Sequence, residues 1–148
     1  MFVPAGFEPP HGLEADAFRL EPLGPEYNER DHAAWSSSIE HILGSPGYGP
    51  ESSWPRPLSL EENLGDLERH ARDFAERTGF TYTVLDSDDD VIGCVYVYPA
   101  RDDVHDVHVQ SWVRESRAHH DMPLREAVAA WLLRDWPFER PLYAPLLG

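Results

Sequence analysis

The sequence lacks lysine entirely and contains a single cysteine, Cys94. All 12 of its basic residues are therefore arginines, which excludes Schiff-base chemistry and phosphate binding by a P-loop lysine. A lone cysteine cannot form a disulfide within the chain, which is typical of a reducing compartment, so we expect a cytoplasmic protein. The N-terminus has no basic start, and no apolar run approaches the roughly 20 residues that span a bilayer. We therefore expect neither a secretory signal nor an association with membranes.

Positive charge is also scarce. The chain carries 27 acidic residues against 12 basic ones, which gives a formal net charge of −15. Such a charge repels nucleic acids and anionic membranes, and it favours cationic partners such as amines. The length of 148 residues and the hydrophobic content of 41% suffice for one domain with a full core.

Hydrophobic periodicity divides the chain into an extended N-terminal arm, residues 1–16, and a single domain, residues 17–148. The arm holds three prolines and two glycines, and we expect its apolar residues to pack on the domain or on a second subunit. Within the domain we predict strands at 17–23, 81–85, 91–98, 105–113 and 141–144. Helices are predicted at 29–43 and 123–136, with a third between them.

The third helix has the clearest signal. Ser59 and Glu62 form a capping box, in which each side chain accepts a hydrogen bond from the other residue's backbone N–H. Apolar residues then follow along one face up to a predicted end at Gly79: Leu60, Leu64, Leu67, Ala71 and Phe74. The following strand 91–98 is apolar on both faces, which predicts a central strand with Cys94 as a small core residue.

A long loop, residues 44–58, joins the first two helices. It contains four prolines and three glycines, and loops of this length are usually functional or flexible. Its aromatic residues Tyr48 and Trp54 are predicted to line a substrate pocket, and simple packing under a lid is the alternative.

The histidines and the acidic turn do not match a known metal site. His105 and His108 are three residues apart, which sends them to opposite faces of a strand. The acidic run at 86–90 is similar to a calcium loop in composition but lacks the downstream glutamate of an EF-hand. We expect a solvated hairpin turn there and no functional metal.

The order of elements resembles the GNAT superfamily of acyl-coenzyme A-dependent N-acetyltransferases. The resemblance covers about residues 17–145, and it is carried by the hairpin strand that starts Val91-Ile92-Gly93, by strand 107–113 and by residues 117–128. It implies an α/β (α+β) fold with a mixed, mainly antiparallel sheet flanked by helices. It also implies acetyl-CoA as the co-substrate.

In that family a loop with the pattern Arg/Gln-x-x-Gly-x-Gly/Ala binds the diphosphate at a helix N-terminus, where unpaired N–H groups attract anions. The matching residues here run from Arg117 to Met122; Arg117 fits, whereas His120 and Met122 replace the small residues. Backbone N–H groups near the end of strand 107–113 would hold the thioester carbonyl. Arginines around the loop would form a positive cluster, or would neutralise neighbouring acids. The implied coenzyme-binding residues are Trp112, Val113, Arg114, Arg117, Ala118, His119, His120, Asp121, Met122 and Arg125.

Acetyl transfer to an amine needs a base for the ammonium and an acid for the departing thiolate. The resemblance implies a base on strand 105–113, where Asp106 and His108 are two residues apart and so share one face. Tyr143 is the nearest implied acid. The alternatives are that Asp106 and His108 are solvated residues and that Tyr143 packs in the core.

Two functions are therefore open. The first is an acyl-CoA-dependent N-acetyltransferase that acts on a small amine. The second is a non-catalytic GNAT-fold module for binding or dimerisation, which His120, Asp121 and Met122 in the loop favour. Family members continue with a helix and two strands beyond the position of Gly148, so we expect a second subunit of a homodimer, or the arm, to complete the acceptor side.

Overall fold

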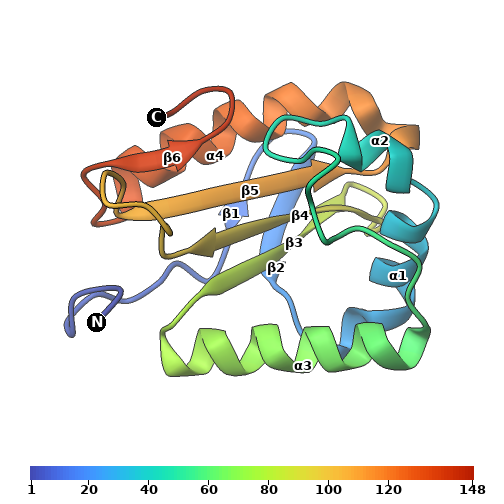
Figure 1. Cartoon of the computed structure of the whole chain (residues 1–148), viewed down its shortest axis with the longest axis horizontal. Helices are drawn as coiled ribbons and strands as arrows, with labels where there is room; N and C mark the ends of the chain where they lie inside the picture. Colours follow the sequence, from blue (N-terminus) through green and yellow to red (C-terminus); the bar gives the residue numbers. More distant parts are fainter.

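Six strands form one sheet in the order β1-β2-β3-β4-β5-β6, in a computed structural model that describes residues 1–148 (Figure 1). Neighbouring strands are antiparallel except for β5 and β6, which are parallel. The strands are β1 (Leu13–Glu14), β2 (Phe18–Pro22), β3 (Phe80–Asp86), β4 (Val91–Tyr98), β5 (Val107–Val113) and β6 (Pro141–Tyr143). This confirms the predicted mixed, mainly antiparallel sheet.

Helices cover both faces of the sheet, and a separate hydrophobic core lies under each layer. Helices α1 (Asn28–Ser36), α2 (Ile39–Leu43) and α3 (Leu60–Glu76) lie over one face, which we call the front face. Helix α4 (Asp121–Asp135) covers the opposite face, and short 3₁₀ helices η1 (Pro25–Tyr27) and η2 (Glu115–His120) precede α1 and α4. None of these helices combines the length and the apolar character that crossing a bilayer requires.

The capping box that predicts α3 is present. The Ser59 hydroxyl accepts a hydrogen bond from the Glu62 N–H at 3.0 Å, and the Glu62 carboxylate accepts one from the Ser59 N–H at 3.0 Å. The helix ends at Glu76, three residues before Gly79, because Arg77 adopts a left-handed conformation with φ of 64°. Gly79 serves a different purpose, since a Cβ there would collide with the ring of Tyr98.

The single helix predicted at 29–43 is wrong, because the chain breaks between α1 and α2. Ser37 donates from its hydroxyl to the Ala34 carbonyl at 3.0 Å, and such side-chain bonds compete with the helical ladder. The hydroxyl of the buried Ser38 accepts a hydrogen bond from the Glu115 N–H at 2.9 Å. The break therefore ties the start of α2 to the segment that precedes α4.

The N-terminal segment packs on the body of the same chain. Val3 is 1% exposed, and the ring of Phe2 stacks between Phe80 and Phe138 at centroid distances of 6.0 and 5.3 Å. The Tyr82 hydroxyl donates to the Pro10 carbonyl at 2.6 Å. β1 then pairs with β2, so these residues extend the sheet by one short strand.

A buried polar network joins α1 to α3. Asn63 accepts from the Trp35 indole N–H at 3.1 Å and donates to the Asp31 carboxylate at 3.1 Å. Asp31 is 4% exposed, and burial raises its pKa to about 6, against the smaller opposing effects of Asn63 and His32. The folded state therefore disfavours the charge that Asp31 carries at neutral pH.

Asp31→Asn is expected to raise the free energy of unfolding at pH 7 by about 3 kcal/mol, since the folded pKa of Asp31 lies about 2 units above the unfolded value and each unit corresponds to about 1.4 kcal/mol. Because the folded pKa lies above the unfolded value of 3.8, the carboxyl stabilises the wild type fully below about pH 4 and loses that contribution as the pH rises through 6. Urea unfolding at pH 4, 5, 6 and 7 measures the difference between the two proteins. A variant that is less stable than the wild type at pH 7 would contradict the expected burial penalty.

Candidate functional site

The parallel strands β5 and β6 pair over a short distance and then separate. Their partners are Val107 with Pro141, His108 with Leu142 and Val109 with Tyr143. After Tyr143 the chain turns back on itself, and the Tyr143 carbonyl accepts from the N–H groups of Leu146 and Leu147 at 2.8 Å each. The second half of β5 therefore lacks a strand on this side. We call the space between Ser111 of β5 and Ala144 after β6 the β5–β6 wedge.

The side chain of Arg125, from the second turn of α4, fills this wedge. Its guanidinium donates to the Ser111 carbonyl at 3.1 Å and to the Ala144 carbonyl at 2.6 Å. Its Nε donates to the Asp121 carboxylate at 3.0 Å, and the side chain is 1% exposed. The wedge is thus lined by backbone carbonyls that accept hydrogen bonds from donors, and in this state a residue of the protein supplies those donors.

Two buried polar atoms at the wedge have no hydrogen-bond partner: the Tyr48 hydroxyl and the second carboxylate oxygen of Asp121. Burial is the main cause that raises the pKa of Tyr48, and the charged groups that also act on it include Arg125 and Asp121. The Tyr48 loop is held over β5 by Gln110, whose side-chain amide donates to the Gly47 carbonyl at 2.8 Å. Each unpaired buried group costs about 1–3 kcal/mol. The wedge therefore has hydrogen-bonding capacity that the protein alone does not satisfy.

Tyr143 and Ser111 lie at the closed end of the wedge. Their hydroxyls are 2.7 Å apart, and both residues are fully buried. Burial raises the pKa of Tyr143, so its phenol stays protonated at neutral pH. Sequence reasoning named Tyr143 and missed Ser111, which had no motif to mark it.

The three arginines predicted to form a positive cluster are separated by their partners. Arg114 donates to the Val91 carbonyl at 3.1 Å, and Arg125 is committed to the wedge. Arg117 makes a looser ion pair with Asp86, in which the nitrogen and the carboxylate oxygen are 3.6 Å apart. Of the three, Arg117 is the one that an incoming anion could recruit with the smallest loss.

The segment predicted to bind diphosphate forms the 3₁₀ helix η2 rather than an open loop. Part of its backbone is already paired, because the Glu115 N–H donates to Ser38 and the Arg117 N–H donates to the Arg114 carbonyl. The rings of His119 and His120 lie 4.1 Å apart. At the end of β5, Trp112 and Val113 pair with β4, whereas three of the segment's predicted residues are exposed: Ala118, His119 and Met122.

Asp106 is not on the face of β5 that sequence reasoning gave it, because the strand begins at Val107. Its carboxylate instead accepts hydrogen bonds from the N–H groups of Glu139 at 2.8 Å and Arg140 at 3.0 Å. His108 does lie within β5, opposite Tyr98 of β4, and burial lowers its pKa. The two predicted bases are therefore apart, and His108 alone projects from the strand.

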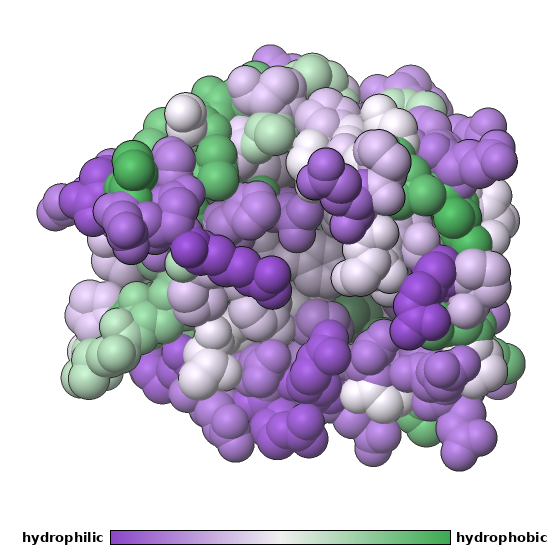
Figure 2. Space-filling model, viewed as in Figure 1, coloured by the Kyte–Doolittle hydropathy of each residue, from purple (hydrophilic) through white to green (hydrophobic).

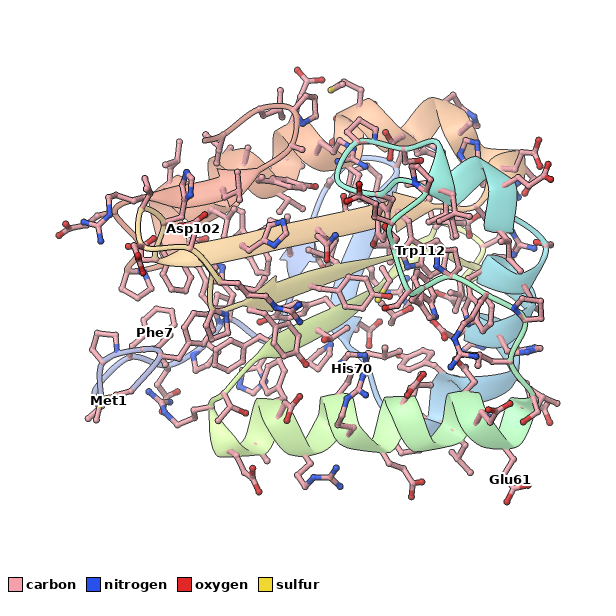
Figure 3. All side chains as sticks on the ribbon, in the orientation of Figure 1. Met1, Phe7, Glu61, His70, Asp102 and Trp112 are labelled. Carbon is pink, nitrogen blue, oxygen red and sulfur yellow. The ribbon has the colours of Figure 1, made fainter.

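Trp54 lies among aromatic rings on the front face. Its ring centroid is 5.3 Å from Trp35, 6.0 Å from Trp112 and 6.3 Å from Tyr96. Figure 3 shows Trp112 in the sheet beneath the loop that carries Trp54. The loop is thus anchored to the front face by Trp54 and reaches the wedge with Tyr48.

Three further polar residues meet on the front face, and sequence reasoning missed them. His70 and Asp73 of α3 contact Tyr98 of β4 through hydrogen bonds. A histidine among the apolar positions of α3 was the available signal, since His70 lies between Leu67 and Phe74 on the side of the helix that faces the sheet.

Comparison with known proteins rests on structure. No protein-family model matches the chain, and no curated protein matches its sequence. Among solved structures, the ribosomal L7/L12 α-N-protein acetyltransferase RimL, in its apo form, matches with a TM-score of 0.68 and 14% identity over 95% of this chain and 75% of that one.

Two other solved acetyltransferase structures are similar to this chain to a comparable degree. The ribosomal-protein-S5-alanine acetyltransferase from Vibrio fischeri matches with a TM-score of 0.66 and 15% identity, over 89% of this chain and 72% of that one. The microcin C7 self-immunity acetyltransferase MccE, in complex with acetyl-CoA and AMP, matches with a TM-score of 0.60 and 10% identity, over 79% and 63%. These similarities confirm the architecture predicted from the sequence: the chain has the GNAT fold.

Proposed function

We propose that this protein is an acyl-CoA-dependent N-acetyltransferase that transfers an acetyl group to a small amine. The observation that carries the proposal is the β5–β6 wedge, where Arg125 occupies the Ser111 carbonyl, its partner Asp121 keeps an unpaired buried oxygen, and the unpaired Tyr48 hydroxyl lies within electrostatic range of both side chains. A ligand that bears both N–H and C=O groups along a narrow chain would satisfy such a set of groups. The pantetheine arm of acetyl-CoA has this composition, and three-dimensional neighbours with the same fold include an acetyl-CoA complex.

Each residue at the wedge would bind a different group of the ligand. The Ser111 carbonyl would accept from a ligand amide once the Arg125 guanidinium moves away, and the Tyr48 hydroxyl would donate to a carbonyl. Arg117 would turn from Asp86 toward the phosphates, since its side chain is 35% exposed and its contact with Asp86 is long, at 3.6 Å. Acetyl-CoA supplies the activated acyl group, and the protein supplies orientation and hydrogen bonds.

An amine acceptor fits the charge of the molecule. The net charge of −15 draws cations toward the surface, and His108 projects from β5 beside the front face. We propose a small diffusible amine as the acceptor. A protein N-terminus is the second candidate, because RimL and the V. fischeri enzyme are named for ribosomal-protein substrates. A cytoplasmic location and a homodimer belong to the same proposal.

Acetyl-CoA at 100 times its dissociation constant is expected to stabilise the protein by about 2.7 kcal/mol. For a domain of this size, that stabilisation raises the melting temperature by about 8 °C. Differential scanning fluorimetry measures the shift, and release of free thiol in the presence of small amines or short peptides measures transfer and separates the two acceptor classes. AMP, which lacks the pantetheine arm, serves as the control and should shift the melting temperature by much less.

A non-catalytic GNAT-fold module is the second candidate function, and one observation favours it. The buried Arg125 pairs with Asp121, whose side chain is 22% exposed, and closes the wedge from within. If neither acetyl-CoA nor CoA shifts the melting temperature at millimolar concentration, the pair is a permanent part of the core and the enzyme proposal fails.

A further inference from the structure

A histidine, a tyrosine and a carboxylate form a connected chain on the front face, outside the wedge. His70 Nδ1 lies 2.9 Å from the Tyr98 hydroxyl, and that hydroxyl lies 2.9 Å from the Asp73 carboxylate. The Thr81 hydroxyl also lies 3.1 Å from His70 Nδ1. Figure 3 shows His70 extending from α3 toward the sheet.

The hydrogen bonds assign one tautomer to His70. A carboxylate only accepts, so the hydroxyl hydrogen of Tyr98 is committed to Asp73. We assign the hydrogen to Nδ1, from which it is donated to the Tyr98 oxygen at 2.9 Å, the shorter of the two contacts there, with the Thr81 hydroxyl at 3.1 Å as a second acceptor. The lone pair of His70 then lies on Nε2, where the Arg69 guanidinium, which can only donate, makes a contact of 3.5 Å at the limit of a hydrogen bond. A histidine that is held firmly by Nδ1, with only this long contact at Nε2, has the arrangement of a general base.

Several features of the sequence hold this chain in place. His70 and Asp73 are three residues apart, so they lie on one face of α3 about one turn from each other. Gly79 leaves the space that the Tyr98 ring occupies. The His70 ring also packs against the rings of Tyr96 and Tyr98, at centroid distances of 5.6 and 6.0 Å. His70 and Tyr98 are thus fixed by packing as well as by hydrogen bonds, and Asp73 is tied to them through the Tyr98 hydroxyl.

The charge state of His70 suits the acceptance of a proton. Burial is the largest cause that lowers its pKa to about 4; Arg69 lowers it further, and Asp73 opposes both. The groups that face the ring are Arg69 and Asp73 from α3, Thr81 from β3, and Tyr96 and Tyr98 from β4. At neutral pH the imidazole is neutral throughout the population. A low pKa also weakens the base, which limits the rate it can supply.

His70 lies on the face where an acceptor would approach the wedge. Tyr98 pairs with His108 across β4 and β5, and Tyr96 pairs with Gln110, which holds the loop that carries Tyr48. Figure 2 shows this face hollowed near its centre, with residues of intermediate hydropathy in the hollow and hydrophilic residues around it. A molecule bound in the hollow would lie between α3 and β5.

We propose that His70 is the base that takes the proton from the acceptor amine, with Asp73 and Tyr98 as positioning residues. This inference rests on the proposed acetyl transfer. An N–H bond of the ammonium breaks, and its proton passes to His70 Nε2. The freed electron pair on nitrogen forms the bond to the acyl carbon, and the C–S bond breaks with its electrons going to sulfur. The second proton on the nitrogen passes to the departing thiolate, which leaves the amide and the free thiol.

His70→Gln should lower kcat/KM for acetyl transfer by about 100-fold at pH 7, the lower end of what a general base contributes. With a peptide α-amine as the test acceptor, the deficit should shrink above about pH 8, where that amine is already deprotonated. Acetyl-CoA binding should stay unchanged. Tyr98→Phe and Asp73→Asn should lower kcat by smaller factors at unchanged KM. His41→Gln, on α2, is the matched control and should keep wild-type activity.

The outcomes distinguish a failure of the role proposed for His70 from a failure of the proposed acetyltransferase activity. A His70→Gln variant with wild-type activity, or with a deficit that is constant with pH, overturns the role of His70 while acetyl transfer stands. A wild type that neither binds acetyl-CoA nor releases thiol overturns both. The imidazole ¹⁵N spectrum of the free protein is an independent readout: a hydrogen on Nδ1 of a ring that stays neutral at pH 6 is expected, and a hydrogen on Nε2 overturns the assignment.

Discussion

Arg125→Met is expected to lower the free energy of unfolding by about 3–5 kcal/mol at pH 7. The substitution keeps most of the volume of the side chain but leaves the Asp121 carboxylate, with its already unpaired oxygen, without a compensating charge. Removing one member of a buried ion pair has this magnitude of effect, because the remaining charge is stranded in a poorly solvated place. The carbonyls of Ser111 and Ala144 also lose their donors. Urea or guanidinium unfolding measures the change.

The double variant Asp121→Asn with Arg125→Met tests whether the unpaired charge of Asp121 causes the loss of stability. It removes the stranded charge, so we expect it to recover a large part of the loss. Arg134→Met on the same helix is the matched control, since Arg134 pairs with Asp135 at the surface and should change stability by about 0.5 kcal/mol or less. If Arg125→Met loses less than about 1 kcal/mol, or if the double variant is less stable than the single variant, the wedge is hydrated and the ion pair is dispensable for stability.

Trp35→Ala is expected to have the second large effect, a decrease of about 3–5 kcal/mol in the free energy of unfolding. Trp35 is fully buried, and its ring contacts Trp54 of the long loop at 5.3 Å and His32 at 5.1 Å. The substitution opens a cavity where α1, α3 and the loop meet, and it leaves the Asn63 side chain without its indole donor. Denaturant unfolding at constant m-value measures the loss.

The same substitution should also affect the wedge. Because Trp54 anchors the loop against Trp35, loosening that contact should release Tyr48 from its position over β5. Trp35→Phe keeps much of the ring and serves as the comparison, with an expected loss well below that of Trp35→Ala. If the two variants are equally stable, the loop is held mainly by other contacts, such as the bond from Gln110 to Gly47.

The fold was largely predictable because its signals are local. The capping box at Ser59 and the period of the apolar residues after it predict α3, the alternation of residues predicts β5, and the continuous apolar run predicts β4. The single helix at 29–43 failed because Ser37 and Ser38 bond to the backbone and to Glu115, and a serine pair gives no sign of its partners in advance. Tertiary contacts outweighed helical periodicity there.

Only part of the geometry at the candidate site could be read from the sequence. The first turns of α4 border the wedge, because Arg125 lies in it. That Arg125 bonds to Ser111 and Ala144, while Arg117 pairs with Asp86, depends on distances between elements that no spacing in the sequence encodes. The placement of Asp106 failed for a related reason, since the strand starts two residues later than predicted and the Asp106 carboxylate accepts a hydrogen bond from the Glu139 N–H.

A crystal structure of the protein grown with coenzyme A tests the binding site most directly. We predict that the pantetheine arm lies between Ser111 and Ala144, with the Arg125 guanidinium withdrawn from the Ser111 carbonyl and the Tyr48 hydroxyl bonded to the ligand. Coenzyme A bound elsewhere, with the bonds from Arg125 to both carbonyls intact, would contradict the assignment of the wedge as the acyl-CoA site.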